Sequence, residues 1–519
     1  MLNKGIPIID LFAGPGGLAE GFSSLVDDNN QRYFNIKISI EKDSHARETL
    51  KLRSFVRQFP YRLLPDEYYQ FLQRKITLDE LYGFYPDEAK EANSEAWQAI
   101  LGETSESEID ERIKNALNGA QDWVLIGGPP CQAYSMAGRS RVGGIAEDDH
   151  RVHLYKEYLR IIALHQPSVF VMENVKGLLS AEVNNEKIFP KILDDLEDPS
   201  SVFPDYISSK YRIRSLVVPE VKKHSDYLIK SEEYGIPQKR HRVILLGIRS
   251  DINEEPDFLI KKTKVDLKSI IGQIPMVRSG VYRQYINTDE IIMEDGTVKK
   301  KRNYKTIKDS FEVWEKLILN FRKDLGELLP KVVAVQSYPK NVGVEFKPYL
   351  GNTLSTGHSL YKWFIDEKIG GILHHVSRGH LTLDLKRYLF ASSFTLKTNK
   401  FPRMEDYIKY GLQPDHDNVG SGKFNDRFRV QIPNEPATTV TSHISKDGHY
   451  FIHYDSVQCR SLTVREAARI QTFPDNYFFC GSRTQQFHQV GNAVPPYLAY
   501  QIAKIVYKLL VPNNRESEL

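Results

Sequence analysis

The stretch PIIDLFAGPGGLAEGFSSLV (7–26) joins an apolar run to a glycine-rich turn and then to a helix-like segment. Residues 7–13 predict a buried strand, and residues 18–26 predict a helix that covers it. Glycines at a strand-to-helix turn let a ligand approach the backbone, and in an open parallel sheet this turn faces the ligand crevice. The turn has neither the GxGxxG spacing of a dinucleotide site nor the GKS/T of a phosphate loop, so both ligands are disfavoured.

Four further apolar runs predict strands: IKISIE (36–41), WVLIGG (123–128), VFVMENV (169–175) and RVILLGI (242–248). Helix-like segments such as HLYKEYLRIIALH (153–165) alternate with them. Near-continuous apolar strands alternating with amphipathic segments predict a parallel sheet covered on both faces. The expected fold class is therefore α/β, a doubly wound Rossmann-like domain. Helical periodicity returns near the end of the chain, at 462–473 and 496–510.

Length and composition limit the remaining possibilities. A chain of 519 residues exceeds the usual size of one core, so we expect two or three domains. No apolar run approaches the ~20 residues of a membrane helix, and the N-terminus does not resemble a signal peptide, so a cytoplasmic protein is expected. The three cysteines, Cys131, Cys459 and Cys480, do not form a disulfide framework or a zinc motif. The histidines of HHVSRGH (374–380) lack a partner at ligand spacing, which favours a structural role and no metal site.

Charge is distributed unevenly along the chain. The net charge is about −8 over residues 61–110 and about +11 over residues 261–430. The acidic part lies in an insert at 51–109 that is predicted to be helical. The basic part fits a surface that binds a polyanion such as nucleic acid, although a solvated basic face explains the charge equally well.

A carboxylate ends the second predicted strand. Glu41 is placed to hold the two hydroxyls of a ribose, as in nucleoside-binding α/β domains. Together with the glycine turn, it favours an adenosine-containing cofactor without phosphates, such as S-adenosylmethionine. A surface glutamate at a strand end is the alternative.

Three further segments carry reactive or charged groups. In GGPPCQ (127–132), Cys131 follows a Gly-Pro-Pro turn at a strand end, where a thiol is displayed, whereas a core cysteine would sit within the apolar run. MENVKG (172–177) places Glu173 at the end of another strand of the sheet. In PQKRHRV (237–243), Arg240 and Arg242 occupy alternate positions at the start of a strand and are expected to point to one face.

Five motifs occur in an order that resembles the DNA (cytosine-5)-methyltransferases, most closely the bacterial restriction–modification branch. The motifs are DLFAGPGG (10–17), GGPPCQ (127–132), ENV (173–175), QKRHR (238–242) and GNAVPP (491–496). The resemblance implies transfer of a methyl group from S-adenosylmethionine to C5 of a flipped-out cytosine in a specific double-stranded DNA sequence. It also implies a monomer that protects host DNA from a companion restriction endonuclease.

The resemblance also assigns roles to residues. Cys131 is implied as the nucleophile that adds to C6 of cytosine, and Glu173 as the contact to N3 and the exocyclic amine. Arg242 is implied as the contact to O2, with Arg240 beside it. A loop after Ser135 is expected to close over the base. The implied cofactor-binding residues are Phe12, Ala13, Gly14, Gly17, Glu41, Asp110, Leu154, Asn492 and Val494. Lys42 departs from the family pattern, which often has an aromatic or large apolar residue there.

The expected organisation is a catalytic and cofactor-binding domain at 1–250, a smaller target-recognition domain at 251–436, and a segment at 437–519 that returns to the catalytic domain. A tRNA-methylating member of the same family is an alternative, against which the long region between QKRHR and TVTSH argues. A catalytically idle DNA-binding scaffold and a thiol hydrolase using Cys131 and a histidine are further alternatives. Neither accounts for the full set of motifs.

Overall fold

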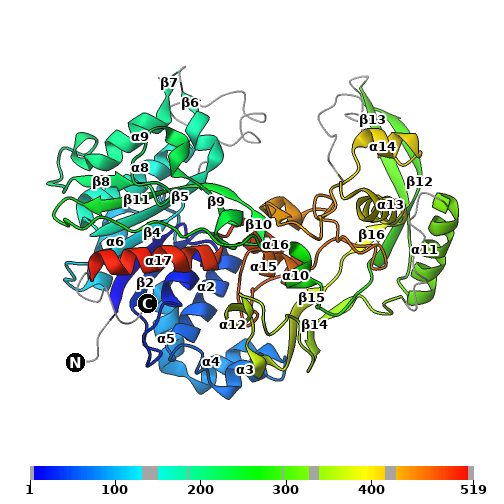
Figure 1. Cartoon of the computed structure of the whole chain (residues 1–519), viewed down its shortest axis with the longest axis horizontal. Coiled ribbons are helices and arrows are strands. Elements are labelled where there is room, and N and C mark those ends of the chain that lie inside the picture. The colour runs from blue at the N-terminus through cyan, green and yellow to red at the C-terminus, as the bar shows by residue number, and fades with distance from the viewer. Residues whose placement is uncertain are drawn as a thin grey trace.

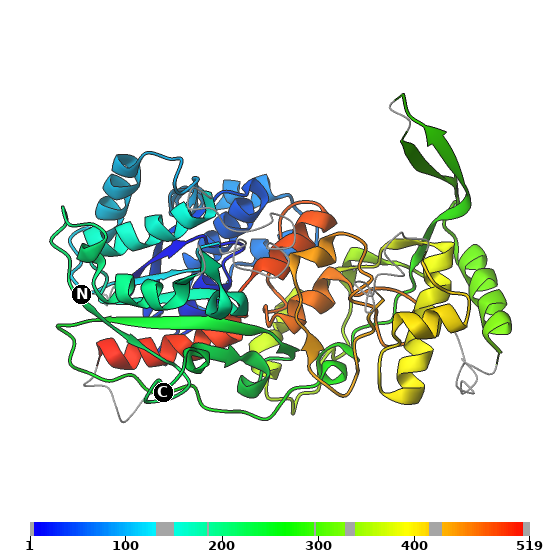
Figure 2. The ribbon, with the colours of Figure 1, turned by 90° about the horizontal axis from the view of Figure 1, so that it is seen from above.

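A computed structural model describes residues 5–130, 150–183, 186–294, 297–326, 338–414 and 428–511. Cys131 and the glycines expected to hinge the loop after it fall outside these residues. Figure 1 shows a larger lobe built on a central sheet and a smaller lobe that carries the long strands β12 and β13. Chain segments from the last quarter of the sequence lie between the two lobes (Figure 2).

The central sheet confirms the predicted α/β class. Its strand order is β3-β2-β1-β4-β5-β11-β8, with β9 also paired to β11. The strands are β1 (Ile6–Leu11), β2 (Phe34–Glu41), β3 (Ala96–Gln98), β4 (Val124–Gly127), β5 (Val169–Val175), β8 (Tyr211–Arg214), β9 (Leu228–Lys230) and β11 (His241–Arg249). The strands from β3 to β5 are parallel, but β11 is antiparallel to β5. The parallel direction expected for the last strand was therefore wrong.

Helices cover both faces of this sheet. Buried side chains of α6 (Glu106–Leu117), α8 (His150–His165) and α9 (Ile188–Glu197) share one core with it. On the other face, α1 (Gly17–Ser23) packs with α17 (Pro496–Leu510), so the end of the chain covers its beginning. Figure 1 shows α17 running across the sheet. Among the described residues, no helix has both the length and the apolar character needed to cross a bilayer.

The insert expected at 51–109 is divided by the structure. The helices α2 (Ser44–Arg57), α3 (Asp66–Leu72), α4 (Leu78–Phe84) and α5 (Pro86–Glu95) precede the edge strand β3. Side chains of α2 to α5 form a core of their own with Leu373 and Phe478. The strand β3 and the start of α6 lie within the expected insert, but β3 is part of the central sheet and α6 packs on that sheet.

The smaller lobe contains the three-stranded sheet β13-β12-β16. Its strands are β12 (Gly280–Ile292), β13 (Val298–Thr306) and β16 (Gly379–Leu381), and its helices are α11 (Phe311–Leu325), α13 (Thr382–Thr398) and α14 (Met404–Lys409). Ile452 and Cys459 join this core from the C-terminal segment. The boundary expected at 436 therefore cuts across one packed core.

A third core lies between the lobes. It draws buried side chains from α10 (Leu267–Ile271), α12 (Tyr361–Phe364), α15 (Val464–Ile470) and α16 (Arg483–Asn492). The paired strands β14 (Gly343–Pro348) and β15 (Gly371–Val376) lie beside it, and β10 (Gln238–Lys239) pairs with β17 (Ala437–Thr438) nearby. The strands β6 (Glu182–Val183) and β7 (Glu186–Lys187) pair with each other in a separate two-stranded sheet. The helix expected at 496–510 is found at those residues.

Candidate active site

The glycine turn and Glu41 meet at the carboxyl ends of β1 and β2. The Gly14 amide donates to Glu41 Oε2 at 2.8 Å, and the Asp43 amide donates to Oε1 at 2.8 Å. Gly14 has φ +57°, and the position that a Cβ would take there has no atom within 4 Å. The turn thus leaves open space beside a carboxylate held in place by backbone donors, which fits a ligand carrying two hydroxyls.

The rest of the turn is fixed by the end of the chain. The Ala13 amide donates to Ile40 O at 3.0 Å, and Phe12 before it adopts a left-handed φ of 54°. A Cβ on Gly17 would lie 2.2 Å from Val494 O, so only glycine fits against that backbone. The last motif therefore packs directly on the turn, and Asn492 is exposed nearby at the end of α16.

Glu173 and Arg242 form an ion pair across β5 and β11. Ile244 lies opposite Glu173 in the antiparallel ladder, which puts Arg242 on the same face as a diagonal neighbour. Arg242 Nε lies 2.7 Å from Glu173 Oε1, and the two side chains are 16% and 14% exposed. The Arg242 guanidinium orients the Glu173 carboxylate. Because both side chains are still partly exposed, they can contact the polar edge of a bound ligand.

The segment that leads into Cys131 runs beside this pair. A Cβ on Gly128 would lie 3.0 Å from Glu173 Oε2. Asn174 Nδ2 donates to Pro129 O at 3.4 Å. The described chain therefore reaches Pro130 next to Glu173, and Cys131 is the next residue in the sequence.

Arg240 has a different environment from Arg242. It lies between β10 and β11, is 3% exposed, and donates through Nη1 to Val440 O at 2.8 Å and to Gly491 O at 3.3 Å. Burial lowers the pKa of Arg240 well below its usual value, and the neighbouring Arg242 charge lowers that pKa further. Arg240 joins the catalytic lobe to the C-terminal segment, and the charges of Arg242 and Glu173 both act on it. That the two arginines share one face stays a prediction.

Asp110 lies away from the cofactor edge of the sheet. It is on α6, where its carboxylate accepts from Arg160 Nη1 at 3.0 and 2.8 Å and lies 3.0 Å from His165 Nε2. This ion-pair network between α6 and α8 corrects the expected contact to adenine. Ile100, which follows β3 and is 37% exposed, lies nearer that edge. Leu154, on α8, packs beside Gly102, which lies with Ile100 in the loop after β3. This position is compatible with the place expected for Leu154.

Asp10 is a buried carboxyl that the sequence reasoning did not single out. It lies on β1, is 0% exposed, and neither oxygen has a hydrogen-bond partner among the described residues. Burial raises the pKa of Asp10 well above its usual value, although the Arg57 charge opposes this. Its position in an apolar β run, one residue before the turn, was the available signal.

The histidines of HHVSRGH (374–380) have separate partners. His374 contacts Glu345 at 3.0 Å and the Phe479 amide at 3.1 Å, whereas His375 lies between Thr463 and Pro275 O. Burial lowers the pKa of both histidines to about 4. In the described part of the chain, no three His, Cys, Asp or Glu side chains gather in a way that could hold a metal.

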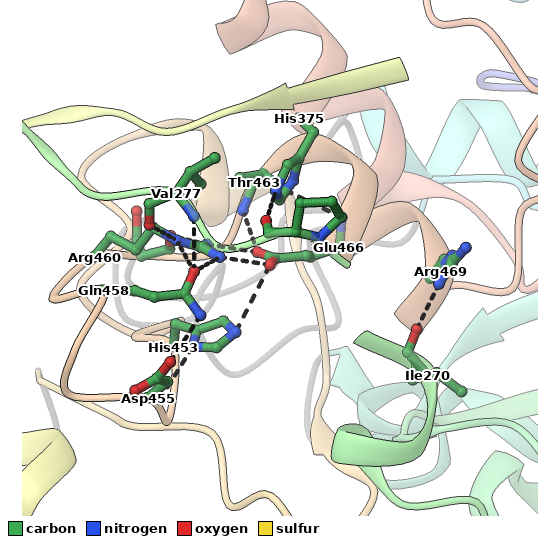
Figure 3. A network of polar contacts seen from close by, with 12 residues as sticks. Ile270, Val277, His375, His453, Asp455, Gln458, Arg460, Thr463, Glu466 and Arg469 are labelled. Carbon is green, nitrogen blue, oxygen red and sulfur yellow. Dashed lines mark hydrogen bonds and ion pairs between the residues drawn. The ribbon is translucent and has the colours of Figure 1, made fainter. Parts of the chain in front are cut away.

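A buried polar network links the C-terminal segment to the start of the smaller lobe (Figure 3). The Glu466 carboxylate faces the Arg460 guanidinium with two N–O distances of 2.7 Å, and both side chains are 1% exposed. The Thr463 amide donates to Glu466 at 2.8 Å in a capping box that begins α15. Arg460 also donates to Val277 O at 3.0 Å, which ties the start of the smaller lobe to α15.

The two other cysteines are buried. Cys459 Sγ lies 3.1 Å from Leu385 O, and the Cys480 amide donates to Thr49. Burial raises the pKa of the Cys480 thiol to about 12 and that of Cys459 higher still. Both residues fit the structural role expected of them.

Comparison with known proteins identifies the family. The family model for C-5 cytosine-specific DNA methylase matches residues 84–508. The type II methyltransferase M.Bpa9945I of Bacillus paralicheniformis is 31% identical over 96% of this chain and 98% of its own length. The type II methyltransferase M1.HphI of Haemophilus parahaemolyticus is 25% identical over 96% of this chain and 86% of its own.

The fold also matches a solved structure. A prophage-encoded DNA modification methyltransferase candidate from E. coli has a TM-score of 0.50 at 20% identity, covering 98% of this chain and 99% of its own. Taken with the family model and the relatives, this agrees with the resemblance that the motifs predicted. The chain belongs to the C-5 cytosine-specific DNA methylases and is a DNA (cytosine-5-)-methyltransferase of the type II restriction–modification kind.

Proposed function

We propose that this enzyme transfers a methyl group from S-adenosylmethionine to C5 of a flipped-out cytosine in one double-stranded DNA sequence, through a covalent bond between Cys131 and C6. The Glu173–Arg242 ion pair carries the proposal. Its Nε–Oε1 distance is 2.7 Å, and it lies beside Gly128, in the backbone that leads into Cys131. The Gly14 turn with Glu41 supplies the cofactor side of the same sheet edge.

The proposed chemistry begins at Cys131. Its thiolate forms a bond to C6 of the cytosine, and the electrons of the C5–C6 double bond move to C5. Glu173 hydrogen-bonds N3 and the exocyclic amine, where charge develops during this addition, and Arg242 orients Glu173 and contacts O2. Bound S-adenosylmethionine would supply a methyl carbon made electrophilic by its positively charged sulfur; C5 would take this methyl group, and the electrons of the broken S–CH3 bond would stay on the sulfur as a neutral thioether. A base then removes the C5 proton, the C5–C6 double bond forms again, and the Cys131 thiolate leaves.

The cofactor contacts are proposed for the residues around the turn. Glu41 would hold the ribose hydroxyls, and the backbone from Phe12 to Gly14 would lie against the ligand. Gly17 and Val494 would shape the wall between the turn and the last motif, and Leu154 would line the pocket near the adenine. Asn492 at the exposed end of α16 would complete the edge.

The biological role proposed is protection of host DNA from a companion restriction endonuclease that cuts at the same sequence. The relatives named above are type II methyltransferases, which supports this role. The enzyme is proposed to act on DNA in the cytoplasm as a monomer. One chain supplies both the turn with Gly14 and Glu41 and the Glu173–Arg242 pair, so no second copy is needed to complete the site.

The direct test is transfer of labelled methyl from S-adenosylmethionine to duplex DNA and to tRNA by the native protein and by Cys131→Ser. We expect label on DNA alone, at C5 of cytosine, and its loss in the variant. Label on tRNA would favour the other branch of the family. Label on neither substrate, or undiminished transfer by the variant, would refute the proposal. Sequencing of methylated cytosines in cells that express the protein would then give the target sequence.

A further inference from the structure

The strands β12 and β13 form a hairpin that extends beyond its sheet. β16 pairs with β12 only at Gly280, Val281 and Arg283, whereas β13 pairs with β12 as far as Ile292. From Gln284 onward, the hairpin is thus a two-stranded ribbon. Nine residues of strand span about 30 Å at ~3.3 Å per residue. Figure 2 shows this ribbon projecting away from both lobes.

The ribbon exposes side chains on both faces. Ile286, Ile292 and Val298 are 60%, 76% and 56% exposed, and among the described residues no helix packs on the outer part of the hairpin. A two-stranded ribbon without a covering layer is marginally stable in water. A 30 Å arm of this kind is therefore expected to gain order from a partner that lies along it.

The outer strand is strongly basic. Residues 298–306 contain four lysines and one arginine and no acidic residue. Lys299, Lys301 and Lys305 alternate along β13 and so point to one face, and all three are exposed. In the described structure, no carboxylate lies within ion-pair distance of these three ammonium groups. Asp289, which lies opposite Lys301, accepts instead from Asn303 at 2.6 Å and from Asn287 at 3.1 Å.

β13 is also an edge strand, so among the described residues one row of its backbone groups has no neighbouring strand. One known role of lysines on an edge strand is to prevent pairing with another chain. Three lysines on one face, about 6.6 Å apart from Lys299 to Lys301 and about 13 Å apart from Lys301 to Lys305, form a row of positive charge along the arm that can contact the phosphates of a nucleic acid. The charge and the dimensions of the arm therefore favour a polyanionic duplex.

The base of the arm is tied to the C-terminal segment that lies between the lobes. Ser279, just before β12, donates through its amide to Gln458 O at 3.2 Å, and Gln458 belongs to the buried network of Arg460 and Glu466. At ~3.4 Å per base pair, the 30 Å ribbon spans about nine base pairs.

We propose that the β12–β13 hairpin is a DNA-binding arm that contacts backbone phosphates outside the sequence that is methylated. This inference rests on the proposed function and adds to it a requirement for flanking duplex. The arm contributes affinity that depends on duplex length and on salt, and it does not select the base.

The test compares Lys299→Ala/Lys301→Ala/Lys305→Ala with the native protein on 12- and 40-base-pair duplexes centred on the methylated cytosine. Fluorescence anisotropy gives the Kd at 50 to 200 mM salt. We expect the native protein to bind the longer duplex more tightly, and the variant to lose this difference while its Kd for the short duplex stays unchanged. Loss of three phosphate contacts should lower the slope of log Kd against log salt by about 2.7.

The matched control removes three exposed lysines from the catalytic lobe, as Lys75→Ala/Lys90→Ala/Lys114→Ala, and should leave the slope and the length dependence as in the native protein. If the first variant does not fold, the arm can be shortened by joining Gln284 to Lys305 through Asn-Gly, because these residues lie directly opposite each other. If the variant folds and keeps the native salt slope and length dependence, the DNA-binding role of the hairpin is refuted, and the proposed methyltransferase function is not affected. Failure of the native protein to bind any duplex would overturn the arm together with the proposed function.

Discussion

Replacing Glu466 by glutamine tests the buried ion pair that links the C-terminal segment to the start of the smaller lobe. The carboxylate makes two 2.7 Å contacts with Arg460, and each side chain is 1% exposed. In Glu466→Gln, the Arg460 charge stays buried without its counterion, and removing one partner of a buried pair costs about 3–5 kcal/mol. Because Val277 O and Gln458 Oε1 still accept from Arg460, we expect the lower end, about 3 kcal/mol.

Urea unfolding followed by tryptophan fluorescence measures this change, because Trp363 is buried in the core that contains α15. The matched control is Glu255→Gln. Glu255 also pairs with two arginines but is 59% exposed, and surface pairs contribute about 0–1 kcal/mol. Replacement of both partners, as Arg460→Met/Glu466→Leu, should recover much of the lost stability. The reasoning would be refuted if Glu466→Gln lowered the free energy of unfolding no more than Glu255→Gln does.

Three further outcomes are expected. Glu41→Gln should weaken S-adenosylmethionine binding measured by calorimetry, because glutamine cannot accept from both the Gly14 and the Asp43 amides, and native affinity would contradict the ribose role. Gly17→Ala should lower the melting temperature and cofactor affinity together, because its Cβ would lie 2.2 Å from Val494 O; native values for both would contradict the close packing. Burial raises the pKa of Asp10, so the folded state holds a proton that the unfolded state loses above about pH 4. Stability contributed by that proton falls as pH rises above this value, so Asp10→Asn should raise the melting temperature more at pH 8 than at pH 5, and a pH-independent shift would count against a protonated Asp10.

The sequence predicted the parts of the fold that depend on local pattern. The strand at 169–175 and the helix at 496–510 have the predicted bounds, since a continuous apolar run and a strong 3.6-residue period leave little choice. β3 was missed because three residues carry too little pattern. The direction of β11 was missed because strand direction depends on the path of the connection, which apolar content does not encode.

The site shows the same limit. Glu173 and Arg242 come together because Glu173 lies near the end of β5 and Arg242 near the start of the antiparallel β11. In the expected parallel sheet a strand start lies at the opposite edge, so the family resemblance indicated this pair and the strand pattern did not.

The burial of Arg240 depends on Val440 O and Gly491 O, which come from the distant C-terminal segment and which the motif around Arg240 does not encode. Asp110 was chosen by its distance from Cys131 along the chain, but α6 lies between β3 and β4 and moves that position into a helix. Spacing in sequence predicts position only where the intervening element is known.

The central claim is that Cys131 bonds to C6 of the target cytosine, and one measurement tests it most directly. A duplex with 5-fluorocytosine at the methylated position has no C5 proton to remove, so the enzyme–DNA bond should persist after methyl transfer. With S-adenosylmethionine present, we expect a denaturation-resistant complex, and peptide mass spectrometry should place the nucleotide on Cys131. Cys131→Ala should form none. A complex that persists in Cys131→Ala, or its absence with an otherwise active native enzyme, would contradict the claim.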